Sequence, residues 1–164
     1  MSLKVFLEVV EIKTKVASVF PFAMGVLFSI SYFQEFHWGY TLLFFVGMII
    51  FDMTTTAINN YIDFKKAQSQ TYKYRENVIG REQLSVVKIQ RMILSMLTAT
   101  LIIGLVLIVQ TGWLMLVMGG VVCFIGVFYT YGPIPLSRMP LGELFSGVTM
   151  GLGIFAITIY LNTI

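Results

Sequence analysis

The sequence predicts an all-α protein, a polytopic membrane helical bundle of about five transmembrane helices, and three observations support this fold class. Hydrophobic residues make up 57% of the 164 residues and charged residues 12%, with a mean hydropathy of +0.86, which is too apolar for a soluble domain. The apolar residues gather in charge-free runs long enough for a helix to cross a hydrocarbon core of about 30 Å. These runs are also too long for barrel strands, which alternate over roughly ten residues.

Charged residues bound the first two predicted spans. Between Lys15 and Glu35 lie 19 uncharged residues, which predict a span near 16–33. Asp52 is the only charged residue among the next 27, and this run predicts a second span near 38–62. The first run is not a cleavable signal peptide, because it is too long and further spans follow it.

The chain beyond the second span predicts three more. A run of 46 uncharged residues before Arg138 is too long for one helix, and a polar break at Gln110-Thr111-Gly112-Trp113 divides it. A further 21 uncharged residues follow Glu143 and reach the last residue. These three spans lie near 91–109, 113–131 and 144–162.

Basic residues set the expected orientation of residues 1–164, which we take as a single integral-membrane helical domain. All eleven lysines and arginines fall in the amino terminus, in the loop after the second span or in the loop after the fourth. The positive-inside rule therefore predicts a multi-pass protein of the cell membrane whose amino terminus and basic loops are cytoplasmic. The net charge of +3 reflects this topology and contact with anionic membrane lipid. We expect no nucleic-acid binding, because no aromatic and basic patch lies on a soluble face.

A polar stripe runs along the second span and is formed by Asp52, Thr55, Thr56, Asn59 and Asp63, whose spacing places them on one helix face. We expect this face to line a cavity that opens to the cytoplasm at Asp63. For the two threonines, hydrogen bonds between helices are the favoured interpretation. Asp52 lies roughly 16 Å deeper than Asp63. We expect it to be protonated or hydrogen-bonded to a neighbouring hydroxyl, and we assign it no catalytic role. For Asn59 with Asp63 we favour a site for Mg²⁺, which prefers hard oxygen ligands.

Two cations follow this helix end in the longest polar loop, residues 64–88. Lys73 and Arg75 come soon enough after Asn59 and Asp63 to fold back over them. A phosphate group beside Mg²⁺ requires such cations, so together these residues describe a diphosphate site. A solvated cytoplasmic loop is the simpler interpretation for the other charged residues of this segment.

The second cytoplasmic loop begins with Tyr129 and Tyr131 and continues with Gly132-Pro133-Ile134-Pro135. The Gly-Pro pair and the second proline end the fourth span sharply. Tyrosine is common at membrane interfaces, which is one interpretation of the aromatic pair. Alternatively, a tyrosine ring stabilises a developing carbocation and its hydroxyl hydrogen-bonds a leaving diphosphate.

Four ordered patches of the sequence resemble a known family. The stretch Asn59-Asn60-Tyr61-Ile62-Asp63-Phe64-Lys65-Lys66 is similar to the first aspartate-rich motif of the UbiA superfamily of intramembrane aromatic prenyltransferases, most closely its 1,4-dihydroxy-2-naphthoate branch in the menaquinone pathway. Residues 13–25 with Pro21, residues 75–80 and residues 129–143 agree as well. Because the patches keep their order along essentially the whole chain, they are more specific together than any one of them.

The motif departs from the family pattern in its acidic residues. Asn60 stands where the family has an aspartate, and Ala67 and Ser69 stand where a later aspartate is expected. By this comparison the first metal site keeps Asn59 and Asp63 but has lost charge.

The chain is also shorter than the family pattern, which has about nine helices and a second aspartate-rich motif after the sixth. No aspartate or glutamate follows Glu143. The resemblance therefore implies that these residues form about half of a nine-helix bundle. The chain would be truncated to the amino-terminal half of the enzyme and would act with a missing carboxyl-terminal half.

The resemblance implies a membrane prenyltransferase that moves a polyprenyl group from polyprenyl diphosphate to an aromatic acceptor such as 1,4-dihydroxy-2-naphthoate. Asn59 and Asp63 would hold Mg²⁺, Lys73 and Arg75 would neutralise the diphosphate, and Tyr129 would face the diphosphate or the allylic cation. The alternative is a non-catalytic membrane protein or subunit derived from that family, in which Asn59 and Asp63 only join helices.

Overall fold

The computed structural model describes residues 1–131 and 142–164, and within these ranges the chain forms helices and no strand. The side chains of 128–131, 143 and 145 also lie outside the described residues. The predicted all-α helical bundle is confirmed.

The helical elements follow one another in the order α1 (Leu3–Val9), η1 (Ile12–Lys15), α2 (Val16–Phe28), η2 (Ser29–Phe33), α3 (Trp38–Lys66), η3 (Tyr72–Glu76), α4 (Val78–Arg81), α5 (Val86–Thr111), α6 (Trp113–Tyr131), α7 (Gly142–Gly147), η5 (Val148–Gly153) and α8 (Ile154–Asn162).

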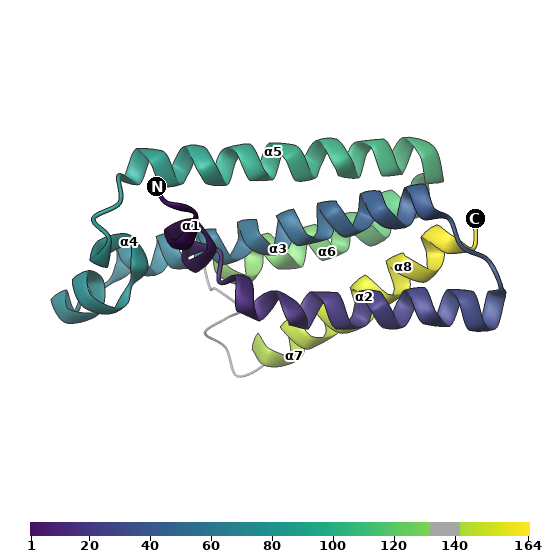
Figure 1. Ribbon diagram of the computed structural model, residues 1–164, viewed down its shortest axis with the longest axis horizontal. Helices are drawn as coiled ribbons and strands as arrows, with labels where there is room; N and C mark the ends of the chain where they lie inside the picture. The colour runs from purple at the N-terminus through teal and green to yellow at the C-terminus, as the bar shows by residue number, and fades with distance from the viewer. Residues whose placement is uncertain (132–141) are drawn as a thin grey trace.

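The long helices run side by side along the longest axis of the molecule (Figure 1). Helix α3 packs most extensively on α5, and α2 packs on α8, while α6 contacts both α3 and α5. The amino-terminal helix α1 and the short α4 lie together at the end of the bundle where α3 finishes (Figure 1). This end therefore holds the elements that surround the polar end of α3.

Three helical segments of the described chain are long and apolar enough to cross a membrane: Ile12–Phe33, Trp38–Lys66 and Val86–Thr111. Two further apolar helical segments are shorter, Trp113–Val127 and Val148–Asn162. Helix α3 continues four residues past the expected end of its span, and α5 begins five residues earlier than expected. Charges mark the edge of the hydrocarbon and not the end of a helix, which explains both differences.

The break between the third and fourth long helices falls at Gly112. This residue has φ +94°, a left-handed conformation that glycine adopts without a side-chain penalty. The hydroxyl of Tyr160 on α8 donates to the carbonyl of Thr111 directly before it. Through this hydrogen bond, helix α8 stabilises the turn at which α5 ends and α6 begins.

Two clusters of buried side chains form the interior. One lies among α3, α5, α6 and α8, and the other lies where α1 and α4 pack on α3 and α5. The buried members of the first are Phe44, Met48, Leu107, Met115, Ile154, Ile157 and Leu161, and those of the second are Val9, Val10, Ala57, Val78, Ile79 and Ile89.

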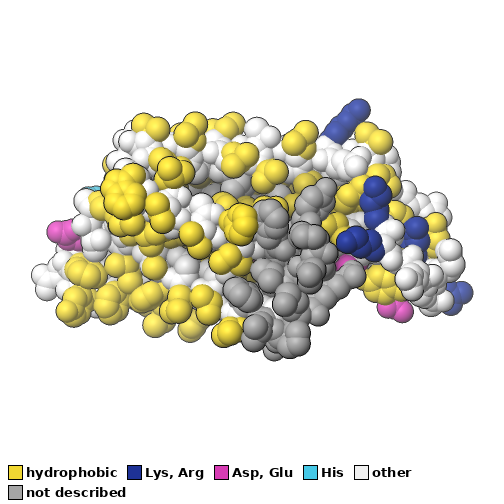
Figure 2. Space-filling view, turned by 180° about the vertical axis from the view of Figure 1, so that it is seen from behind, with side chains coloured by type: hydrophobic (Ala, Val, Ile, Leu, Met, Phe, Trp, Pro, Cys, Tyr) yellow, Lys and Arg dark blue, Asp and Glu magenta, His cyan; other side chains and the backbone are white. Residues whose placement is uncertain are grey.

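Large apolar side chains are also abundant on the outside, as a lipid-facing surface requires. Leu94, Ile102 and Val109 on α5 and Val121 on α6 are examples, each more than half exposed. Figure 2 shows hydrophobic side chains along most of one face and lysine and arginine gathered at one end. The molecule is thus an integral membrane bundle with a single basic end on this face.

Candidate functional site

A cavity of about 550 Å³ lies between η1, α2, α3, α5, α6, α7, η5 and α8, and some of its lining residues are also exposed on the outer surface. Most of its wall is apolar, and most of its polar residues come from η1, α2 and one face of α3. The apolar wall includes Phe44, Met48, Phe51, Ile103, Leu107, Met115 and Ile157, and the polar part includes Thr14, Lys15, Ser18, Asp52, Thr55, Thr56 and Asn59.

The polar stripe of α3 supplies four residues of this polar part, because its members lie on one helix face. Asp52, Thr55, Thr56 and Asn59 all line the cavity. Asp63 does not line it and lies half-buried one helical turn beyond Asn59. The amide of Asn59 is therefore at the polar rim of the cavity, with the carboxylate of Asp63 one turn farther out.

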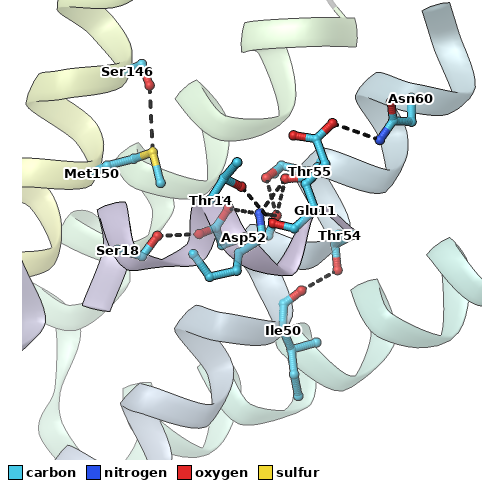
Figure 3. Close-up of polar contacts among 12 residues, drawn as sticks. Glu11, Thr14, Ser18, Ile50, Asp52, Thr54, Thr55, Asn60, Ser146 and Met150 are labelled. Atoms are coloured by element: carbon cyan, nitrogen blue, oxygen red, sulfur yellow. Dashed lines mark hydrogen bonds and ion pairs between the residues drawn. The ribbon is translucent and has the colours of Figure 1, made fainter. Parts of the chain in front are cut away.

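Asp52 forms a buried ion pair that the sequence interpretation did not foresee. The ammonium nitrogen of Lys15 lies 2.7 Å from Oδ1 of Asp52, and the side chains are only 5% and 11% exposed. The hydroxyl of Ser18 donates to the other oxygen, Oδ2 (Figure 3). Asp52 thus accepts a hydrogen bond from a hydroxyl, as predicted. Its charge is also compensated by Lys15, a residue that the sequence places at the edge of the first span.

Lys15 uses all three of its donors in this arrangement. Besides Oδ1 of Asp52, its nitrogen donates to the backbone carbonyl of Asp52 at 3.2 Å and to the hydroxyl of Thr56 at 2.6 Å. The general rule that a charge in a membrane span pairs with another charge is the signal that could have found this contact.

The two threonines of the stripe behave differently from one another. Thr56 accepts from Lys15 and so joins α3 to η1, as the interhelical interpretation predicts. Thr55 donates to the carbonyl of Asp52 at 3.0 Å, within its own helix. For Thr55 the predicted bond between helices is therefore wrong, because its hydroxyl satisfies an oxygen of the preceding turn.

Asn60, which replaces the family's aspartate, turns away from the cavity. Its amide nitrogen donates to the carbonyl of Val9 at 2.9 Å and to the carboxylate of Glu11 at 3.2 Å, the second of which Figure 3 shows. Its backbone carbonyl accepts from the side chain of Asn77 at 3.0 Å. Asn60 therefore connects α3 to the amino-terminal segment and to α4.

The two predicted diphosphate-binding cations lie on η3, which folds back on the end of α3. The Lys73 nitrogen is 4.9 Å from the ring centroid of Phe64, the residue after Asp63. Arg75 is exposed on the same short helix. Tyr129 belongs to α6, but its side chain lies outside the described residues, as do 132–141 of the second loop.

The described residues contain no group of three or more His, Cys, Asp or Glu side chains that could hold a metal ion. Asn59 and Asp63 supply one amide oxygen and one carboxylate on the same helix face. Mg²⁺ is commonly held by one or two carboxylates together with substrate phosphates and water. This donor pair therefore fits a Mg²⁺ ion shared with a diphosphate better than an ion enclosed by protein alone.

Apolar helices with a partly polar internal cavity define an integral membrane protein with a binding site inside its bundle. Residues 18–164 match the UbiA prenyltransferase family, so the chain belongs to this family. It is similar to a 1,4-dihydroxy-2-naphthoate octaprenyltransferase of Bacillus subtilis (strain 168), with 27% identity over 155 residues. The match covers 92% of this chain and 48% of that relative, so the chain spans about half of its length. No solved structure matches.

Proposed function

We propose that this chain contributes to a membrane prenyltransferase that moves a polyprenyl group from polyprenyl diphosphate to an aromatic acceptor such as 1,4-dihydroxy-2-naphthoate. The observation that carries this proposal is the cavity, which is apolar over most of its wall and has Asn59 among its polar residues. A polyprenyl diphosphate has the same division into an apolar chain and a charged head. Membership of the family and the name of the Bacillus relative support the reaction and the acceptor.

In this proposal the diphosphate binds beyond the polar rim of the cavity. Asn59 and Asp63 would hold Mg²⁺ there, and Lys73 and Arg75 would compensate the remaining charge of the diphosphate. Tyr129 faces the diphosphate or the allylic cation. Bound Mg²⁺ would stabilise the negative charge that the departing diphosphate gains.

The apolar residues of the cavity would have a different role from these polar residues. Phe51 and Met48 belong to the wall that would receive the first isoprene units and keep water from the reactive carbon. In this proposal the basic end of the bundle faces the cytoplasm, as the positive-inside rule favours. The residues described here supply one part of the site, and the second aspartate-rich motif of the family would supply the other.

The test is binding and transfer measured side by side on the full chain in lipid nanodiscs. Labelled polyprenyl diphosphate is titrated with Mg²⁺ or with a chelator, and transfer to 1,4-dihydroxy-2-naphthoate is then followed. We expect Mg²⁺-dependent binding that weakens about tenfold or more in Asp63→Asn, because a charged ligand to the ion is lost. Glu76→Gln on η3 is the matched control and should bind as the wild type does.

The outcomes separate the enzyme from a non-catalytic relative. Transfer that needs a co-expressed carboxyl-terminal half from the Bacillus relative would support a divided site. Turnover by this chain alone would show that no second half is needed. If Asp63→Asn and the chelator both leave binding unchanged, the diphosphate site is wrong and a non-catalytic subunit becomes the better interpretation.

A further inference from the structure

We propose that the outer face of α5, at its amino-terminal end, is a docking site for an anionic phospholipid. Lys88 and Arg91 contact the phosphate of the lipid head group, and Lys65 adds positive charge from α3. The exposed apolar side chains that follow Arg91 on the same face contact the acyl chains. This site lies on the outside of the bundle, so it is separate from the cavity and goes beyond the proposed prenyl transfer.

One face of α5 is exposed over the first half of the helix and beyond. Val87, Leu94 and Ile102 are each more than half exposed, and Thr98 between them is exposed as well. Their spacing places them on one helix face. Arg91 is also exposed and shares this face, because it lies four residues after Val87 and three before Leu94. Helix α5 forms one edge of the bundle (Figure 1), so this face meets lipid and not another helix.

The length of α5 places its amino-terminal end at the level of the lipid head groups. Its 26 residues extend roughly 39 Å at 1.5 Å per residue, whereas the hydrocarbon core is about 30 Å thick. About six residues must therefore lie outside the core. Lys88 and Arg91 fall within the first six, and every later residue of the helix is uncharged. At this depth their long side chains reach the phosphate layer.

The positive charge at this end has no carboxylate partner among the described residues. Helix α5 contains no aspartate or glutamate. The ion pairs within the described part of the chain involve neither Lys88 nor Arg91. The acidic residue that most closely precedes the helix, Glu82, already pairs with Arg81. An anionic head group supplies the missing negative charge.

A third cation reaches the same place from α3. The side-chain nitrogen of Gln90 donates to the hydroxyl of Tyr61 at 2.8 Å and joins the beginning of α5 to the end of α3. The ammonium nitrogen of Lys65 lies 5.5 Å from the ring centroid of Tyr61. Asp63 is two residues from both Tyr61 and Lys65, so it faces a different side of α3. Basic side chains from two helices therefore border this patch.

The charge of the head group is what distinguishes one lipid from another here. Any phospholipid covers the apolar stripe of α5, so the stripe does not discriminate between lipids. Each basic residue near an anionic head group strengthens its binding about fivefold. The stripe instead explains why the ligand is a lipid and not a free phosphate, which would contact only exposed and hydrated cations.

The experiment measures lipid selectivity beside Arg91 by fluorescence quenching. Both native tryptophans, Trp38 and Trp113, are changed to phenylalanine, and Val87→Trp supplies a single reporter. The full chain is reconstituted in mixtures of phosphatidylglycerol and phosphatidylcholine in which one or the other lipid is brominated. We expect phosphatidylglycerol to be favoured at the reporter by about tenfold. Equal quenching by the two brominated lipids overturns the proposal without any change to the cations.

A positional control and two charge variants assign this preference. A chain that keeps only Trp113, which is exposed just beyond the opposite end of α5, should prefer neither lipid by more than about twofold. Lys88→Gln with Arg91→Gln should remove the preference at the reporter. Lys13→Gln with Lys66→Gln removes the same charge from exposed positions outside α5 and should retain it.

Three further results would contradict the docking site. They are an equal preference at Trp113, a preference that survives the loss of Lys88 and Arg91, and displacement of brominated phosphatidylglycerol by soluble glycerol 1-phosphate. The last result would mean that the head group binds without its chains. None of these measurements contains polyprenyl diphosphate, so the lipid site and the proposed function fail independently.

Discussion

The ion pair between Lys15 and Asp52 places two opposite charges on the wall of an apolar cavity. Removing an ion from water costs several kcal/mol even after the surroundings relax, and only good geometry offsets that cost. Lys15 reaches this geometry with three hydrogen bonds, while Asp52 receives bonds on both carboxylate oxygens. At the scale of single residues, each charge therefore depends on the other.

We expect Lys15→Met alone to lower the free energy of unfolding by about 3–5 kcal/mol, because it leaves the Asp52 carboxylate buried without its counter-charge. The double change Lys15→Met with Asp52→Leu should recover most of that loss. Reversible unfolding in mixed micelles, followed by helicity, measures both. Equal losses in the single and double variants would mean that charge compensation is not what the pair contributes.

The stripe on α3 was predictable from sequence because side chains three or four residues apart share a helix face. The partner of Asp52 was not, since Lys15 is 37 positions away and their contact depends on how η1 and α2 pack against α3. The sequence interpretation used Lys15 only as a boundary marker. The same limit applies to Asp63, which belongs to the stripe but lies outside the cavity lining.

Between elements, Asn60 organises the junction at the end of α3. Its side chain donates to α1 through Val9 and to Glu11, and its carbonyl accepts from Asn77. Asn77 in turn accepts from the backbone of Ile79 and caps α4. The residue that looked like a lost acidic group of the motif is thus a donor that holds the amino-terminal segment on α3.

We expect Asn60→Asp to release α1 from α3, because a carboxylate would face the Val9 carbonyl and the carboxylate of Glu11. The loss should be about 1 kcal/mol, the low end of the cost of an unsatisfied polar group, because Asn60 is only partly buried. Hydrogen exchange at Val9 and Val10 would report it as faster exchange. Adding Glu11→Lys should restore protection through a new ion pair, and failure of that rescue would contradict this account.

The same junction contains a close approach between η3 and α4. A Cβ built at Gly80 would lie 1.9 Å from the carbonyl oxygen of Lys73, a backbone atom that cannot move alone. Arg81 on α4 also reaches Glu8 on α1 at 2.5 Å, and its hydrogen bonds to Glu8 and then Glu82 raise the pKa of Arg81. That pair is exposed on both sides, so it contributes little to stability.

We therefore expect Gly80→Ala to displace η3 and lower the free energy of unfolding by about 1–3 kcal/mol, the usual cost of overpacking. Because Lys73 would move with η3, binding of polyprenyl diphosphate should weaken as well. Gly39→Ala is the matched control, since nothing lies within 4 Å of a Cβ there. Wild-type stability and binding in Gly80→Ala would show that the contact yields without cost.

At the scale of the whole molecule, the length of α3 and the position of its charged residues determine which part of this helix extends beyond the hydrocarbon core. Helix α3 has 29 residues and is roughly 44 Å long at 1.5 Å per residue, while the hydrocarbon core is about 30 Å thick. Its end from Asn59 onward can therefore lie at the interface together with α1, η3 and α4. The number of apolar runs could be predicted from the sequence. The continuation of α3 to Lys66 could not, because hydropathy does not report where a polar helix ends.

The basic end of the bundle leads to a prediction for the orientation of the whole chain, which we expect to place its amino terminus in the cytoplasm. Cys123 is the single cysteine, so Cys123→Ser gives a background in which one reporter cysteine can be placed at will. Ser69→Cys lies in the loop after α3, at the basic end, and Gln34→Cys lies between η2 and α3, at the opposite end; both positions are exposed. A membrane-impermeant maleimide should label the first only in inverted vesicles and the second only in right-side-out vesicles. The reverse pattern would place the polar end of α3 outside the cell, where it could not receive a cytoplasmic diphosphate.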